Sequence, residues 1–225
     1  MNTDSQRLQQ VSEEFQHMVE EFFLVQSRYS AAIKEIQTKL EILDDEFQMR
    51  HRRNPIHHMQ SRLKTIQSML EKLKRKNYEV SINSAVKNLQ DIAGIRVICS
   101  YVQDVYTIAN LLVSQDDVHL VRMADYIREP KPNGYRSLHL IVEIPVFLSE
   151  GRILVPVEVQ IRTIAMDFWA SLEHSLRYKA QEYIPQHISD ELQRVATDIA
   201  SLDQRMQAIH DQVDELSDAH GDNAT

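Results

Sequence analysis

The sequence has 225 residues, of which 43% are hydrophobic and 26% are charged, and this composition argues against a disordered chain. No apolar run approaches the roughly 18 residues of a membrane-spanning helix, and the first ten residues are too polar for a secretion signal. The net charge of −8 argues against general binding to DNA, and the single Cys99 cannot form an internal disulfide, so we expect a cytoplasmic protein with no membrane partner.

Positive charge is concentrated between residues 50 and 76, where Glu71 is the only acidic residue. The cations are Arg50, Arg52, Arg53, Arg62, Lys64, Lys72, Lys74, Arg75 and Lys76. A local cationic surface on an acidic protein favours a small polyanion as ligand, although a solvated helix face is the plainer interpretation of charge alone.

Helical spacing dominates the first part of the chain. Apolar residues from Phe15 to Phe47 predict a long amphipathic helix, which ends before a break at residues 50–55. A second helix is predicted from His57 to Lys76, with Leu63 and Leu73 among its inward residues. This helix would carry most of the cationic stretch.

The middle of the chain changes to the period of strands. Residues 92–99, 118–123, 137–144 and 153–161 are short, β-branched segments bounded by Gly, Pro or Asp, and they predict strands of one sheet. A crossover helix is predicted near residues 105–112, and a hairpin near Gly151. The last part is helical again over 164–178 and 188–216, with a break at Pro185. Heptad-like apolar steps in its second helix predict a seam against the first helix or another subunit.

Strand alternation predicts where polar side chains gather. Val157 and Val159 would face the core, while Glu158, Gln160 and Arg162 would face the opposite way. The same alternation places His139 and Arg96 on this polar face, with Asp91 at the entrance of the strand that carries Arg96. So much polarity on one face predicts a site rather than a wet surface.

Two carboxylates opposite cations are suited to phosphoryl-type transfer on a nucleotide. Asp91 and Glu158 could bind Mg²⁺ through oxygen, and the cations would neutralise charge that develops on the phosphates. The sequence contains no GxxxxGK[ST] loop, so side chains would have to hold the phosphates.

Three segments carry a resemblance to a known family: "DIAGIRVICSYVQDVY", "KPNGYRSLHL" and "VEVQIRTIAMDFWASLEHSLRYK". Together they resemble the small alarmone synthetases, the single-domain members of the RelA/SpoT homologue family, over about residues 54–178. The segment "NPIHHMQSRLKTI" is more similar to the RelP branch than to the RelQ branch.

This resemblance implies an α/β (α+β) fold, with a mixed sheet of about five strands flanked by helices, similar to nucleotidyltransferases. It implies three parts: an N-terminal helical extension (1–50), the synthetase domain (51–180), and a C-terminal oligomerisation helix with an acidic tail (181–225). The family's enzymes transfer pyrophosphate from ATP to the 3'-hydroxyl of GTP or GDP, release AMP, and are commonly homotetramers. Either (p)ppGpp or RNA could be an effector.

The resemblance also assigns roles to individual residues. Asp91 and Glu158 match the Mg²⁺-binding pair, and Glu158 would assist deprotonation of the 3'-hydroxyl. The ATP-site positions are Arg62, Lys64, Lys72 and Arg96, with Arg75 and Gln160 as weaker candidates. The acceptor-site positions are Lys131, Tyr135, His139, Asp167 and Glu173. Tyr135 would stack on guanine, and Asp167 stands where some relatives have Asn.

The role of Gly134 in "KPNGYRS" is open between two physical reasons. The glycine either permits a positive backbone φ or lets a nucleotide pass close to the chain, and "PNG" could also be a simple turn into an edge strand. Two other functions also stay open. They are a nucleotidyltransferase-like enzyme that attacks the α-phosphorus, and a non-catalytic module that binds RNA or an alarmone.

Overall fold

A mixed five-stranded sheet forms the centre of the protein. The structure is a computed structural model that describes residues 2–180 and 184–221. The strands are β1 (Ile56–Leu63), β2 (Ala93–Cys99), β3 (His119–Asp125), β4 (Leu138–Leu148) and β5 (Gly151–Thr163), in the spatial order β1-β2-β5-β4-β3. β2 and β5 are parallel and the other neighbours are antiparallel, which confirms the predicted fold class.

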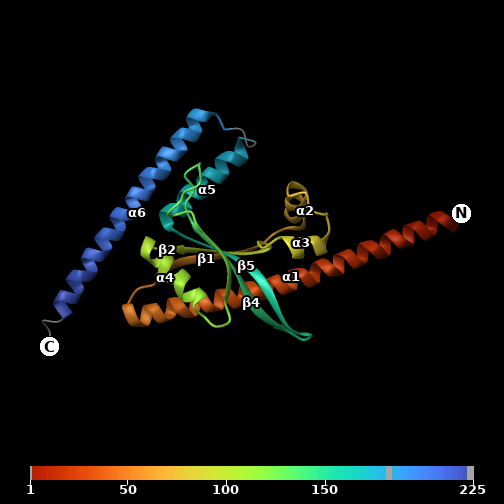
Figure 1. The fold of residues 1–225 in the computed structure, drawn as a ribbon, viewed down its shortest axis with the longest axis horizontal. Coiled ribbons are helices and arrows are strands. Elements are labelled where there is room, and N and C mark those ends of the chain that lie inside the picture. Colours follow the sequence, from red (N-terminus) through yellow and green to blue (C-terminus); the bar gives the residue numbers. More distant parts are fainter. Residues whose placement is uncertain (1, 181–183, 222–225) are drawn as a thin grey trace.

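Six described helices surround this sheet (Figure 1). They are α1 (Asn2–His51), α2 (Ile66–Arg75), α3 (Ile82–Asn88), α4 (Val102–Val113), α5 (Ile164–Lys179) and α6 (Gln186–Gly221). α1 runs beneath the sheet and projects beyond it at the N-terminal end, while α6 lies on the far side and packs against α5 and α4 (Figure 1). No helix within the described ranges is both long and apolar enough to cross a membrane.

The core lies between α1, α4 and one face of the sheet. Ile36 and Leu40 of α1 are fully buried, as are Val157 and Val159 of β5. The predicted alternation of β5 is therefore confirmed. Apolar packing covers one face of the sheet, so the polar residues of the strands must lie on the other face.

The second predicted helix is wrong in its first half, since residues 56–63 form the edge strand β1. Backbone hydrogen bonds to β2 hold this strand, with Arg62 opposite Gly94, and they need no apolar side-chain period. The helix begins only at Ile66, where the Thr65 side chain accepts a hydrogen bond from the Ser68 amide. This correction places Arg62 at the edge of the sheet and Lys64 directly after it.

Gly134 has a positive φ of 90°, so the first of its two expected reasons is confirmed. Its close neighbour in the structure is α6: a Cβ added at this position would lie 2.6 Å from the Cβ of Ala196. The Gly134 amide also donates to the Lys131 carbonyl over 2.8 Å, which closes a turn. The loop that precedes β4 is thereby pressed against α6.

We expect Gly134→Ala to destabilise the protein more than Gly151→Ala does. Both glycines have positive φ, but a Cβ at Gly151 would meet nothing within 4 Å. The control therefore contains the backbone strain alone, while Gly134→Ala adds overpacking against α6, which costs about 1–3 kcal/mol. Urea unfolding of both variants measures the difference, and equal losses would show that α6 does not press on this loop.

Candidate active site

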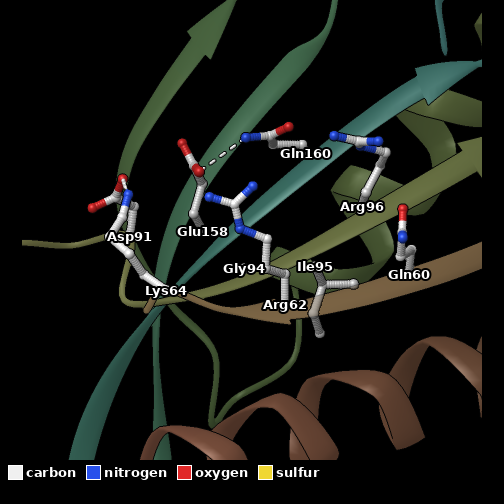
Figure 2. Close-up of a pocket in the computed structure, with 9 residues that line it drawn as sticks. All are labelled: Gln60, Arg62, Lys64, Asp91, Gly94, Ile95, Arg96, Glu158 and Gln160. Carbon is white, nitrogen blue, oxygen red and sulfur yellow. Dashed lines mark hydrogen bonds and ion pairs between the residues drawn. The ribbon is translucent and has the colours of Figure 1, made fainter. Parts of the chain in front are cut away.

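The polar face of β1, β2 and β5 contains a cavity of about 370 Å³ (Figure 2). It is lined by Gln60, Arg62, Lys64, Asp91, Gly94, Ile95, Arg96, Glu158 and Gln160. Register explains the grouping, because Gly94 lies between Arg62 on one side and Glu158 on the other, and Arg96 lies opposite Gln160. Gly94 has no side chain, so the floor between these polar groups stays open.

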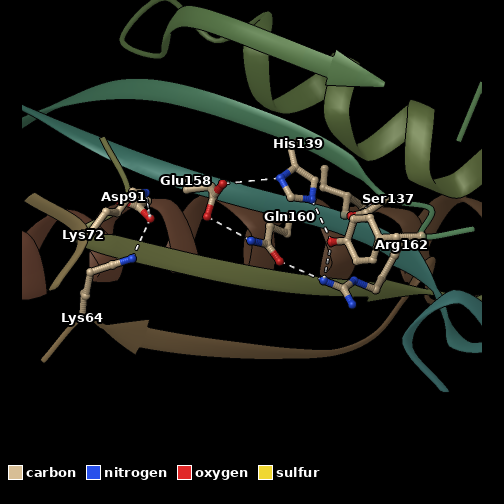
Figure 3. Close-up of polar contacts among 10 residues, drawn as sticks. Lys64, Lys72, Asp91, Ser137, His139, Glu158, Gln160 and Arg162 are labelled. Atoms are coloured by element: carbon tan, nitrogen blue, oxygen red, sulfur yellow. Dashed lines mark hydrogen bonds and ion pairs between the residues drawn. The ribbon is translucent and has the colours of Figure 1, made fainter. Parts of the chain in front are cut away.

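Asp91 binds two lysines through one of its oxygens. Its Oδ2 accepts hydrogen bonds from Lys64 Nζ at 2.6 Å and from Lys72 Nζ at 2.5 Å (Figure 3). Burial by itself would raise the pKa of Asp91, but the two lysines outweigh it and hold the pKa below its ordinary value. The other oxygen, Oδ1, is buried and has no hydrogen-bond partner.

Glu158 is held through both of its oxygens. Gln160 Nε2 donates to Oε2 at 2.9 Å, and His139 Nδ1 lies 3.4 Å from Oε1 (Figure 3). Burial again favours the neutral form, yet His139 and Gln160 lower the pKa of Glu158 overall.

Because the folded pKa values of Asp91 and Glu158 are both depressed, the stability they contribute is present above the ordinary carboxyl pKa. This stability is lost as the pH falls through the depressed values.

Tyr135 lies beside this cavity and connects to it through His139. The Tyr135 hydroxyl is 2.8 Å from His139 Nε2 and accepts a hydrogen bond from Arg162 Nη2 at 3.1 Å. Lys131 Nζ lies 4.8 Å from the centre of the Tyr135 ring and 4.5 Å from that of Tyr126, which is cation–π distance. The predicted acceptor residues Lys131, Tyr135 and His139 are therefore neighbours.

The two acidic residues predicted on α5 occupy different surroundings. Asp167, in the first turn, lies 3.5 Å from Arg96 and 3.4 Å from Arg162. Glu173 is buried, accepts a hydrogen bond from Asn133 Nδ2 at 3.0 Å, and pairs with Arg177. Asp167 thus borders the cavity through Arg96, while Glu173 anchors the loop that carries Tyr135.

The structure does not bring every predicted residue into the cavity. Arg75, at the end of α2, is exposed and is not part of the cavity wall. Lys72 also lies outside the lining and reaches the site through Asp91.

Sequence reasoning missed Gln60 and Asn133, and it predicted the direction of Arg162 without assigning it a role. The alternation of β5 was the available signal for Arg162; Asn133 reaches its site only through a contact with a distant helix.

The carboxylates fit a hard divalent cation. Asp91 Oδ1 is a buried carboxylate oxygen with no partner, which is a suitable ligand, and Glu158 lines the same cavity. Residues 2–180 and 184–221 contain no cluster of three or more His, Cys, Asp or Glu side chains able to hold a metal. A two-carboxylate site suits Mg²⁺, which commonly uses one or two carboxylates and completes its shell with water and substrate phosphates.

A cavity on a mixed sheet that is lined by two carboxylates and several cations is suited to phosphoryl transfer. The model of the region found in RelA / SpoT proteins matches residues 61–183. The chain belongs to the RelA/SpoT family.

Relatives from Bacillus subtilis extend the similarity beyond this region. The GTP pyrophosphokinase YwaC is 45% identical over 83% of this chain and 89% of its own length. YjbM, also a GTP pyrophosphokinase, is 38% identical over 85% of this chain and 89% of its own.

Solved structures show the same fold. The small alarmone synthetase 2 from B. subtilis aligns with a TM-score of 0.74 at 43% identity, over 82% of this chain and 96% of that one. The B. subtilis small alarmone synthetase 1 bound to its product pppGpp aligns with a TM-score of 0.75 at 37% identity, over 82% of this chain and 94% of that one.

Proposed function

We propose that this protein is a GTP pyrophosphokinase, which transfers the β,γ-pyrophosphate of ATP to the 3'-hydroxyl of GTP or GDP. The products are pppGpp or ppGpp, the alarmones of the stringent response, and AMP. The observation that carries this function is one cavity lined by both carboxylates, Asp91 and Glu158, together with the cations Arg62, Lys64 and Arg96. Two relatives that match most of the chain are named GTP pyrophosphokinases.

The cationic wall supports a role in holding the triphosphate of ATP. Arg62, Lys64 and Arg96 line the cavity from β1, β2 and the segment between them, so their charges converge on one volume. Positioned cations stabilise the charge that develops on the transferred group without having to reorganise. Lys72 supports this wall by holding Asp91 beside Lys64.

Glu158 is the carboxylate best placed to take the proton of the attacking hydroxyl. Its depressed pKa keeps it charged at neutral pH, and it lies next to His139, which connects to the aromatic acceptor side at Tyr135. We assign the base role to Glu158 and guanine stacking to Tyr135. Asp91 and Glu158 would hold Mg²⁺, which would bind the phosphates and neutralise their charge.

The test is to incubate the protein with ATP, GTP and Mg²⁺ and to identify the products by mass. The proposal requires AMP together with pppGpp. Release of pyrophosphate instead would identify a nucleotidyltransferase that attacks the α-phosphorus, and unchanged nucleotides would indicate a non-catalytic binding module. Repeating the incubation with GDP and with Mg²⁺ replaced by a chelator measures the acceptor range and the metal requirement.

We also expect a homo-oligomer, as a homotetramer, that assembles through α6. Val195, Leu202, Met206, Ile209 and Val213 of this helix are each more than a third exposed. Such an apolar row on a single chain is suited to contact with another copy. Light scattering at several concentrations measures the mass, and a monomer at every concentration would contradict this expectation.

The division into a helical extension (1–50), a synthetase domain (51–180) and a C-terminal oligomerisation region (181–225) is part of the same proposal. The matched region 61–183 supports its central part, while residues 181–183 and 222–225 lie outside the described structure.

The nucleotide substrates and the free, buried thiol of Cys99 support a cytoplasmic location. A (p)ppGpp or RNA effector would be detected by adding either to the activity assay.

A further inference from the structure

Arg162 is a buried cation to which neither the resemblance nor the cavity lining assigns a role. It is 2% exposed and immediately precedes Thr163, the residue that caps α5. Its Nη2 donates one hydrogen bond to Gln160 Oε1 at 2.8 Å and another to the Tyr135 hydroxyl at 3.1 Å. These two contacts make Arg162 the origin of two hydrogen-bonded arms, and both arms lead to Glu158.

The first arm runs through an amide. Gln160 accepts from Arg162 through Oε1 and donates from Nε2 to Glu158 Oε2 at 2.9 Å. An amide has one accepting end and one donating end, and a guanidinium can only donate. Arg162 therefore fixes the orientation of the Gln160 amide, so that its donating end faces the carboxylate.

The second arm runs through a hydroxyl and an imidazole. Since the Tyr135 oxygen accepts from Arg162, its own hydrogen is free to point at His139 Nε2, 2.8 Å away. His139 Nε2 is then the acceptor, and a neutral imidazole must carry its proton on Nδ1. That nitrogen lies 3.4 Å from Glu158 Oε1.

The five side chains form a closed ring of contacts. Figure 3 labels four of them, His139, Glu158, Gln160 and Arg162, beside the Asp91–lysine cluster. Within this ring, Arg162 can only donate hydrogen bonds, and the Glu158 carboxylate can only accept them. With the Tyr135 hydroxyl donating to His139, every contact of the ring runs from Arg162 towards Glu158. Both Glu158 oxygens are consequently approached by donors from fixed directions.

Pairing with Asp167 does not explain this placement of Arg162. Asp167 lies 3.4 Å from Arg162 and also 3.5 Å from Arg96, so one carboxylate is shared by two guanidinium groups. The shorter contacts of Arg162 go to neutral acceptors. A buried guanidinium that donates to neutral groups, here the Tyr135 hydroxyl and the Gln160 amide, is suited to orienting them.

We propose that Arg162 is a positioning residue that holds Glu158 in its catalytic orientation through two arms, Gln160 on one side and Tyr135–His139 on the other. This inference rests on the proposed function, because it takes Glu158 as the catalytic carboxylate. Arg162 itself is not among the residues that line the cavity. Its loss should lower kcat by about 10- to 100-fold, the usual cost of losing a partner that orients a catalytic group.

The first measurement needs no substrate. In protein labelled with ¹⁵N-histidine, the ring nitrogen shifts of His139 report which nitrogen carries the proton, and the signal is assigned by its loss in His139→Asn. The ring requires the proton on Nδ1. A proton on Nε2 in the wild-type protein would overturn the proposal, whatever the activity assay shows.

The second measurement is a cycle of kcat values. Arg162→Met removes all donors, Arg162→Lys keeps a donor-only group, and the double variant Tyr135→Phe/Gln160→Met cuts both arms while leaving Arg162 in place. We expect Arg162→Met and the arm variant to lose kcat alike, Arg162→Lys to recover part of it, and Arg162→Met to add less than about twofold to the arm variant. Independent, multiplying losses would mean that Arg162 acts by packing, and would overturn the proposal.

A failure of Arg162→Met to fold leaves the test intact. The arm variant keeps the buried guanidinium, and Arg162→Lys keeps its charge, so both can be measured in its place. A wild-type kcat in the arm variant would overturn the inference. Absence of alarmone synthesis by the wild-type protein would instead overturn the proposed function, and the histidine measurement would still report on the ring.

Discussion

Asp91→Asn and Glu158→Gln should each lower kcat for pppGpp synthesis by at least about 1000-fold. Each substitution removes one charge from the carboxylate pair and with it several kcal/mol of metal-dependent transition-state stabilisation. The buried, unpartnered Oδ1 of Asp91 and the doubly held Glu158 are the ligand atoms at stake. Steady-state assays with saturating ATP and GTP measure the loss.

The control for this prediction comes from the same sheet. Glu143 of β4 lies on the same face as His139 by strand alternation, but it is not part of the cavity lining. Glu143→Gln repeats the chemical change outside the site and should keep wild-type activity. Circular dichroism and thermal unfolding of all three variants exclude a loss of fold, and near wild-type activity in either Asp91→Asn or Glu158→Gln would contradict its assignment.

The fold could be predicted where side-chain burial alone decides the structure. The alternation of Val155 to Ile161 in β5 and the helical spacing of Ile33, Ile36 and Leu40 in α1 both follow from packing on one core. β1 failed this reasoning because it is an edge strand held by backbone pairing, and most of its residues are exposed. The apolar spacing of α2 was therefore extended backwards, into a segment that a different interaction controls.

For the site, the sequence could predict only the face of the sheet on which each strand residue lies. Alternation put Glu158, Gln160 and Arg162 on one face, which the structure confirms, but it carries no information on the register between strands. The contact of Asn133 with Glu173 and that of Gly134 with Ala196 depend on how the α5 and α6 helices pack against a loop. Such contacts arise from tertiary packing, so no local pattern in the sequence predicts them.

The surroundings of Tyr135 indicate that its ring and its hydroxyl have separate roles, which the sequence alone did not distinguish. Its ring lies within cation–π distance of Lys131 and has Tyr126 at its edge, which is suited to holding a base near a phosphate-binding cation. Its hydroxyl instead joins His139 and Arg162. Two substitutions should therefore have different kinetic effects, one acting on the ring and the other on the hydroxyl alone.

Tyr135→Ala should raise the KM for GTP by about 5- to 150-fold, which corresponds to the loss of about 1–3 kcal/mol of base stacking, with a much smaller change in the KM for ATP. Tyr135→Phe keeps the aromatic face and should leave the KM for GTP near wild type, while its kcat falls because the arm to His139 is cut. Kinetics with GTP and ATP varied separately, on variants shown to be folded, measure both effects. An unchanged KM for GTP in folded Tyr135→Ala would rule out stacking. Equal losses for both substrates would show that Tyr135 serves only the turn before β4.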